Sequence, residues 1–332
     1  MSALVFDAPK IPVTVLTGFL GSGKTTLLRH LLAHPDMDET AVIVNEFGAV
    51  GLDHHLLESS DEDTLLLDNG CLCCGLRGDL VETLLSLLER RERGEVPVFR
   101  RVVIETTGLA DPVPVLQTFR TDPLRLSLYE IGGLVTCFDA VNGLATLERH
   151  GEAERQLALA DTVVLTKADL PHDPDVAAEI ARRNGRARVL TALEGQLNPG
   201  EVLAVPTPLA GVQTGADHHH GHHHHDRIVS VSVAGSATLS WDHVRQSVAD
   251  LVEQHGDKLL RVKGLLRVEG FEGPVSVDGV QHLFHRPRPL ESWPAGVSEP
   301  FLVGIAEGAT AQDVGRWLRG VLEPAGAAQV GL

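Results

Sequence analysis

Basic residues are scarce in this sequence. Its 332 residues include 28 Lys and Arg against 45 Asp and Glu, which leaves a formal net charge of −17 at pH 7 with histidine neutral. A general nucleic-acid binder needs a basic face that neutralises phosphates. The composition therefore argues against nucleic acid as a partner.

Long apolar runs and a signal peptide are also missing. No run approaches the roughly 18 to 20 apolar residues that span a bilayer. The first residues, MSALVFDAPKIPVTVL, lack a basic segment followed by an uninterrupted apolar stretch. The sequence thus predicts a cytoplasmic protein with no membrane partner.

The first two-thirds of the sequence alternates between short apolar runs and segments of helical periodicity. Nearly continuous apolar runs are typical of strands covered on both faces, and they occur at Ile11–Leu16, Ala41–Val44, Arg101–Ile104, Leu134–Phe138 and Thr162–Leu165. Helices are predicted at Thr25–Ala33, Asp79–Arg91, Ala153–Ala160 and Asp175–Arg183. Such alternation favours right-handed βαβ units. We therefore predict an α/β fold with a doubly wound, mostly parallel sheet.

A linker is predicted from about Glu201 to Asp226, because this stretch is rich in Pro, Gly and His and has no hydrophobic periodicity. Beyond it, strands are predicted at Ile228–Val233, Leu259–Val268, Val275–Phe284 and Phe301–Ile305, and helices at Trp241–His255 and Thr310–Leu322. This order predicts a second, smaller α+β domain. The expected division is a nucleotide-binding domain at 1–205, a His-rich linker at 206–226 and a C-terminal domain at 227–325.

A phosphate-binding loop is predicted directly after the first strand. The segment GFLGSGKT, from Gly18 to Thr25, fits G-x-x-x-x-G-K-[ST] with a strand before it and a helix after it. In such a loop, glycines let N–H groups turn inward around phosphate, Lys24 reaches the β and γ phosphates, and the Thr25 hydroxyl ligates Mg²⁺. A glycine-rich turn that contains Lys-Thr by chance is the alternative. The predicted nucleotide-binding residues here are Gly18, Gly21, Ser22, Gly23, Lys24, Thr25 and Thr26.

Two more predicted sheet strands end in polar residues. Glu105 can hold Mg²⁺ through water, and the Gly108 N–H can contact the γ-phosphate. In Thr166-Lys167-Ala168-Asp169, the Asp169 carboxylate can accept two N–H groups of a guanine edge while the Lys167 stem covers the base. This arrangement favours GTP over ATP, and a helix N-cap is the alternative role for Asp169.

Three of the four cysteines lie in the segment Cys71-Leu72-Cys73-Cys74. The spacing is too tight for a disulfide framework and suits a metal or redox centre. In an extended segment the side chains of Cys71 and Cys73 lie on one face and can bind one metal ion. Cys74 or a nearby carboxylate can complete the coordination site. Thiolates favour Zn²⁺ or Cu(I) over Mg²⁺. Buried structural cysteines and a redox switch are the alternatives.

A histidine tract in the linker can also collect metal. Neutral imidazoles on a flexible segment bind Zn²⁺, Ni²⁺ or Co²⁺ without a fixed geometry, which predicts weak sites for metal capture or storage. An engineered tag is the alternative, although tags usually lie at a terminus. The histidines are His218, His219, His220, His222, His223, His224 and His225.

Five ordered motifs resemble the CobW-type P-loop GTPases, a family of metallochaperones related to the G proteins that insert nickel into hydrogenase and urease. They are TGFLGSGKTTLL at Thr17–Leu28, VNEFGAVGLD at Val44–Asp53, NGCLCC at Asn69–Cys74, ETTGLADP at Glu105–Pro112 and TKAD at Thr166–Asp169. Together with the C-terminal domain, the resemblance spans nearly the whole chain.

The resemblance implies a role for each matching residue. Lys24 and Thr25 serve phosphate and Mg²⁺, Glu105 and Gly108 form the hydrolytic switch, and Thr166, Lys167 and Asp169 bind guanine. Cys71, Cys73 and Cys74 become the family's C-x-C-C metal motif, with Glu46 as a further carboxylate ligand or switch residue. Thr166 stands where many GTPases have Asn, which implies a weaker contact with the base.

These expectations combine into a GTPase that carries zinc at the C-x-C-C site and passes it to a metal-requiring client protein as the nucleotide changes. The expected cofactors are GTP, Mg²⁺ and Zn²⁺. Zinc is favoured because thiolates suit it and because TGLADP with a His tract resembles the zinc-handling branch. Cobalt delivery for cobalamin synthesis, nitrile hydratase activation, and a zinc buffer with vestigial nucleotide binding are the alternatives. A small-molecule kinase would need an acceptor site that we do not find, and a homodimer stays open.

Overall fold

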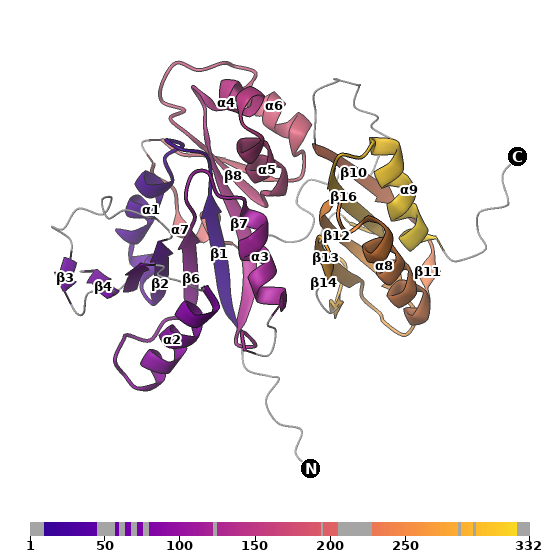
Figure 1. Ribbon diagram of the computed structural model, residues 1–332, viewed down its shortest axis with the longest axis horizontal. Helices are drawn as coiled ribbons and strands as arrows, with labels where there is room; N and C mark the ends of the chain where they lie inside the picture. Colours follow the sequence, from indigo (N-terminus) through magenta and orange to yellow (C-terminus); the bar gives the residue numbers. More distant parts are fainter. Residues whose placement is uncertain are drawn as a thin grey trace, which may run out of the picture. The chain divides into compact units, whose positions relative to one another are not determined.

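The computed structural model describes residues 10–44, 57–59, 64–67, 72–75, 80–121, 125–193, 195–204, 228–284, 287–294 and 297–323. These residues form two compact units (Figure 1). The first unit lies within Met1–Ala177 and Arg188–Val205, and the second within Ala178–Ala187 and Pro206–Leu332. No helix in the described part of the chain is long and apolar enough to cross a membrane.

The first unit is built on a nine-stranded sheet of order β3-β4-β5-β2-β6-β1-β7-β8-β9. Neighbouring strands from β5 to β9 run parallel, and β3 and β4 add an antiparallel edge. This confirms the predicted mostly parallel α/β fold. The strands are β1 (Ile11–Thr17), β2 (Thr40–Val44), β3 (Leu57–Ser59), β4 (Thr64–Leu67), β5 (Leu72–Gly75), β6 (Arg101–Glu105), β7 (Tyr129–Asp139), β8 (Thr162–Thr166) and β9 (Arg188–Thr191).

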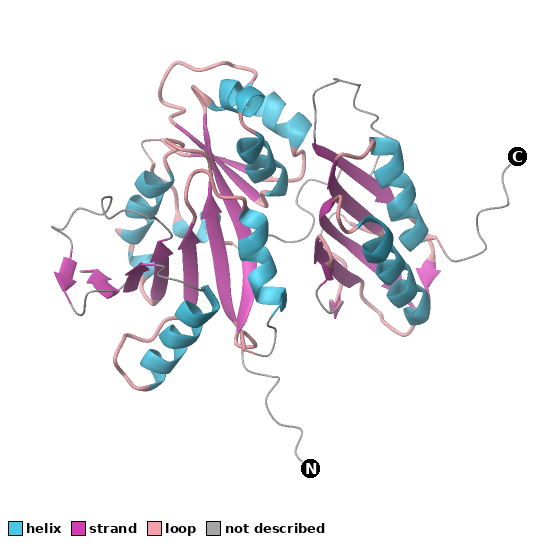
Figure 2. Cartoon of the chain, viewed as in Figure 1, coloured by secondary structure: helices cyan, strands magenta, loops and turns pink. Residues whose placement is uncertain are grey.

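Helices cover both faces of this sheet (Figure 2). Residues on opposite faces of one strand therefore belong to different cores. In β1, Val13 packs with α2 and α3, whereas Leu16 packs with α1. Burial on both faces explains why these strands read as continuous apolar runs. The helices of this unit are α1 (Lys24–Leu32), the short 3₁₀ helix η1 (Pro35–Met37), α2 (Leu80–Glu92), α3 (Pro112–Thr121), α4 (Gly143–Arg149), α5 (Gly151–Leu159) and α7 (Pro199–Val202). Helix α6 (Val176–Arg183) follows β8 along the chain, and most of its residues are grouped with the second unit.

Several elements of the first unit were not predicted. The helix α3 begins with Pro112-Val113-Pro114, where prolines hide the helical period, although Pro is well tolerated in a first turn. The Asp111 carboxylate caps this helix by accepting a hydrogen bond from the Val113 N–H at 2.9 Å. The short helix α4 and the short strands β3, β4 and β9 were also not predicted, because elements of few residues carry little periodicity.

The second unit has an antiparallel sheet of order β10-β16-β12-β13-β14, with β11 added to β12 and β15 to β13. Helices α8 and α9 pack on one face of it, which confirms the predicted α+β class. The elements are β10 (Ile228–Ala234), β11 (Thr238–Leu239), α8 (Trp241–His255), β12 (Leu259–Val268), β13 (Val275–Val280), β14 (Leu283–Phe284), β15 (Arg288–Pro289), β16 (Phe301–Glu307) and α9 (Ala311–Leu322).

The segment Val275–Phe284, predicted as strand structure broken by Gly and Pro, contains two strands. The chain forms the hairpin of β13 and β14, in which Val280 pairs with Leu283. Gln281 turns the chain with a left-handed φ of 50°. Tight hairpins need such positive φ values, and Gln gives no sequence signal for one.

Candidate functional site

The phosphate loop lies between β1 and α1. Its three motif glycines have φ values of 140° for Gly18, 72° for Gly21 and 87° for Gly23, a region that side chains rarely adopt. Gly23 occupies the N-cap of α1, which has no side-chain cap and no acidic residue in its first turn. A helix N-terminus of this kind attracts anions through its N–H groups and dipole. The loop is therefore built to receive phosphate.

Lys24, Thr25 and Glu105 meet beneath this loop. The buried Lys24 donates hydrogen bonds from Nζ to the carbonyl oxygens of Gly18 at 2.9 Å and Phe19 at 3.2 Å. Thr25 lies 80 residues before Glu105, yet its Oγ1 donates to Glu105 Oε1 at 2.8 Å. Parallel strands bring their carboxyl ends to one edge, and Glu105 ends β6 beside β1. Hydroxyl and carboxylate oxygens are ligands that suit Mg²⁺.

The segment after β6 packs between the phosphate loop and α5. A Cβ on Gly108 would lie 2.6 Å from the backbone nitrogen of Leu20, so only glycine fits there. On the other side, buried Gln156 of α5 donates from Nε2 to the carbonyls of Gly108 at 3.2 Å and Ala110 at 2.9 Å. One side chain of α5 thus fixes two carbonyls of the predicted switch segment.

A second link from α5 reaches the same segment. Arg155 Nη1 lies 2.8 Å from Asp111 Oδ2, and both side chains are about one-third exposed. Such a partly exposed ion pair contributes little stability by itself. Together with the hydrogen bonds of the next residue, Gln156, it holds the end of the segment against α5.

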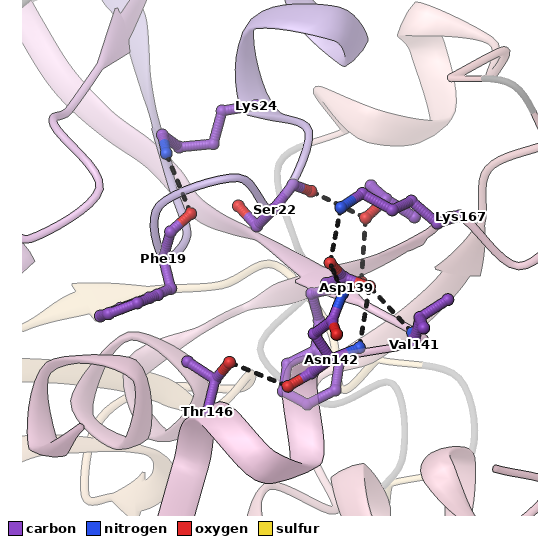
Figure 3. A network of polar contacts seen from close by, with 10 residues as sticks. Phe19, Ser22, Lys24, Asp139, Val141, Asn142, Thr146 and Lys167 are labelled. Carbon is purple, nitrogen blue, oxygen red and sulfur yellow. Dashed lines mark hydrogen bonds and ion pairs between the residues drawn. The ribbon is translucent and has the colours of Figure 1, made fainter. Parts of the chain in front are cut away.

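The predicted guanine motif follows β8. The buried Thr166 hydroxyl lies 2.7 Å from the Ser22 carbonyl and 3.1 Å from the Phe138 carbonyl, so it bonds the phosphate loop and β7. Lys167 has a left-handed φ of 57° and places Nζ 2.6 Å from Asp139 Oδ2 (Figure 3). Asp169 is exposed. The three predicted guanine residues thus have different surroundings: only Asp169 faces solvent freely.

A cavity of about 240 Å³ lies beside the loop. Among its lining residues are Ser22, Asp139, Asn142, Gln156 and Lys167. The buried Ser22 Oγ and Gln156 Oε1 have no hydrogen-bond partner in the described structure. Buried polar atoms normally find partners, so these two atoms mark the cavity as a place for water or a polar ligand group.

Two ionisable groups of β7 have shifted pKa values. Burial alone would raise the pKa of Asp139, but hydrogen bonds from Lys167, Asn142 and Val141 together hold it below its usual value. Cys137 lies behind the loop, and burial raises the pKa of its thiol to about 12, although the Lys24 charge acts in the opposite direction. The Asp139 side chain is therefore ionised at neutral pH, and the Cys137 thiol is protonated.

The predicted zinc site falls largely outside the described residues. Cys71, Glu46 and the histidines from His218 to His225 all lie there. Cys73 and Cys74 lie on β5, where their backbone pairs with Val42 and Ile43 of β2. Within the described ranges no group of three His, Cys, Asp or Glu residues is placed to hold a metal ion. The C-x-C-C site stays a prediction.

Sequence reasoning missed Asp139 and Gln156. A signal existed for Asp139, because it follows the buried run Leu134–Phe138 at the end of a sheet strand, as Glu105 follows its own strand. Gln156 had no signal within its helix, since only the packing of α5 shows where its side chain points.

The fold and site together define a P-loop nucleotide-binding protein. The chain belongs to the CobW/HypB/UreG family: the model of that family's nucleotide-binding domain matches residues 12–191. The cobalamin synthesis protein CobW C-terminal domain matches residues 228–322.

Named relatives and a solved structure agree with this family. The zinc chaperone YjiA of Escherichia coli is 35% identical over 82% of this chain and 87% of its own length. The zinc chaperone CobW of Pseudomonas aeruginosa is 33% identical over 83% of this chain and 82% of its own. The crystal structure of Zn(II)-bound YjiA GTPase from E. coli has a TM-score of 0.75 and 30% identity, covering 95% of this chain and 100% of that chain.

Proposed function

We propose that this protein is a GTP-hydrolysing zinc chaperone, which binds zinc at Cys71, Cys73 and Cys74 and passes it to a metal-requiring client protein when the nucleotide changes. The observation that carries the proposal is the convergence of Lys24, Thr25 and Glu105 on the phosphate loop of a chain from this family. The zinc part is supported by the names of the relatives and by the thiolate chemistry of the motif.

In the proposed reaction Lys24 neutralises phosphate charge and the loop N–H groups orient the phosphates. Thr25 and Glu105 would hold Mg²⁺, which supplies charge neutralisation at the β and γ phosphates. Gly108 packs against Leu20 of the loop, which supports a role for its N–H in contacting the γ-phosphate. Lys24 donates hydrogen bonds to the Gly18 and Phe19 carbonyls, and phosphate oxygens would replace these carbonyls as acceptors when nucleotide binds.

Guanine selection is assigned to Asp169 and Lys167. The exposed Asp169 carboxylate can accept two N–H groups from guanine, whereas adenine offers a different pattern. We expect slow turnover in the protein alone, because the sequence shows no obvious arginine finger. A client or bound metal would then complete the site.

Hydrolysis is tested with GTP and ATP in parallel. Lys24→Ala should abolish turnover and weaken phosphate binding, while Asp169→Ala should remove the preference for GTP. Equal hydrolysis of both nucleotides by the unmodified protein, unchanged in Asp169→Ala, would contradict the guanine assignment.

Zinc transfer is tested by chelator competition in the GDP state and with a non-hydrolysable GTP analogue. The three cysteines are replaced by serine in protein lacking Asp217–Asp226, so that the His tract cannot mask the tight site. We expect tight zinc binding to disappear in that variant. The two nucleotide states should differ about 5- to 150-fold in zinc affinity, as is typical of coupled sites. Identical affinities would exclude nucleotide-driven release. Parallel titrations with Co²⁺ measure how strongly the site prefers zinc.

A further inference from the structure

The side chain of Lys167 is held by a carboxylate that lies outside the guanine motif. Lys167 Nζ lies 2.6 Å from Oδ2 of Asp139, which ends the neighbouring strand β7 (Figure 3). The backbone of Lys167 is left-handed, with a φ of 57°. Non-glycine residues adopt this conformation at an energetic cost, and it persists where surrounding contacts impose it.

The Asp139 carboxylate is itself fixed by three further donors. Oδ1 accepts from the N–H groups of Val141 at 2.8 Å and Asn142 at 3.0 Å, and Oδ2 accepts from Asn142 Nδ2 at 3.1 Å. Only 10% of the Asp139 side chain is exposed, against 36% for Lys167. The anion is therefore the rigid partner, and the lysine is the partner that it positions.

Strand pairing gives this contact its place in the site. Asp139 pairs with Thr166 at the ends of β7 and β8, so the carboxylate lies next to the first residue of the predicted guanine motif. The lysine stem runs from the motif backbone to this anchor. Asp169, the residue predicted to read the guanine edge, follows Lys167 by two residues in the sequence.

We propose that Asp139 is a positioning residue for purine recognition, which holds Lys167 so that its aliphatic stem forms one wall of the base site. The inference rests on the proposed function, because it assumes that a purine nucleotide binds at this motif. Asp139 does not touch the base. It therefore supports every purine equally, whereas Asp169 reads the guanine edge.

The test uses GDP and inosine diphosphate as probes of the full chain. Inosine diphosphate lacks the exocyclic amino group of guanine, so Asp169 makes one hydrogen bond fewer to it. In Asp139→Asn the Oδ1 acceptor is retained, but an amide NH₂ replaces Oδ2 and faces the donors of Lys167 and Asn142. Since a hydrogen bond to a charged group is lost, we expect both diphosphates to bind about 10-fold more weakly.

Kinetics and a mutant cycle separate positioning from general damage. The KM for GTP should rise while kcat stays within about twofold, because the phosphate contacts are untouched. Lys167→Met keeps the stem but lacks the ammonium, so it should lose affinity like Asp139→Asn. The double variant should be no weaker than either single variant, as expected for one shared contact.

Asp173→Asn is the matched control, because Asp173 is exposed and the change removes the same charge. Thermal melting shows whether each variant is folded. If Asp139→Asn does not fold, the binding measurements are made with Lys167→Met instead. Unchanged or tighter binding of both diphosphates would overturn the proposal, as would a loss confined to GDP. Failure of the unmodified protein to bind GDP would instead refute the proposed function.

Discussion

Replacing Gly108 by alanine tests the close packing between the switch segment and the phosphate loop. An added Cβ would lie 2.6 Å from the Leu20 nitrogen and 2.8 Å from its Cα, whereas real Cβ atoms essentially never come within 3.0 Å of such atoms. The Leu20 side chain is 58% exposed and can move aside, but its backbone belongs to the phosphate loop. The loop or the segment must therefore shift by several tenths of an ångström.

The magnitude follows from the cost of overpacking. Forcing an extra carbon into a packed site typically costs about 1 to 3 kcal/mol. For a unit of this size each kcal/mol lowers the melting temperature by about 2 to 4 °C, so Gly108→Ala should melt about 2 to 12 °C lower. If the loop relaxes in the free protein and nucleotide must restore it, the same cost weakens GDP binding by about 5- to 150-fold.

The assay combines thermal melting with calorimetric titration of GDP. Gly320→Ala is the matched control, because the residue is inside helix α9 and, among the described residues, no atom outside its own helix backbone lies within 4 Å of the added Cβ. That control should keep or slightly raise the stability, since alanine favours a helix. If Gly108→Ala has the same melting temperature as the unmodified protein and binds GDP equally well, the inference that the switch segment packs closely against the phosphate loop is wrong.

Three further predictions concern buried groups. Gln156→Leu leaves two carbonyls without their donor and should lower the free energy of unfolding, measured by urea denaturation, by about 1 to 3 kcal/mol. The control is Glu152→Gln, at an exposed position of the same helix, which should change the free energy of unfolding little. An equal loss in both variants would contradict the role of the Gln156 hydrogen bonds. Because the folded-state pKa of Asp139 is lowered, its ionisation stabilises the fold above the unfolded pKa of about 4, and this contribution is lost as pH falls through the lower folded value. The stability gap to Asp139→Asn should thus close in acid, and a gap independent of pH would count against the ion pair. The Cys137 thiol is buried and has a pKa of about 12, so it should resist alkylation near pH 8 in the folded protein. The test uses protein whose other cysteines are replaced by serine. Rapid labelling of Cys137, detected by mass spectrometry, would contradict its burial.

Local patterns determined the parts of the site that depend on neighbouring residues. The loop from Gly18 to Thr25 has fixed spacing, and its chemistry resides in backbone N–H groups, one lysine and one hydroxyl, so a short segment suffices to recognise it. Apolar runs and helical periodicity likewise predicted the parallel sheet, because strands buried on both faces read as continuous apolar segments.

The meeting of Thr25 with Glu105 was predictable for a different reason. Polar residues at the carboxyl ends of parallel strands converge at one edge of a sheet, and the rule needs only that both strands be recognised. The Thr25 hydroxyl lies 2.8 Å from the Glu105 carboxylate, in agreement with that reasoning.

Tertiary structure alone decided which side chains support the site from behind. The Thr166 hydroxyl reaches the Ser22 carbonyl across 144 residues, and Asp139 reaches Lys167, because the strand order places β7 between β1 and β8. Gln156 reaches the Gly108 carbonyl because α5 packs beside that segment. Strand order and helix packing depend on the free energy of the whole core, and no local spacing encodes them. The sequence by itself therefore indicated which groups are candidates for binding nucleotide, whereas the packed fold determined which groups hold them in position.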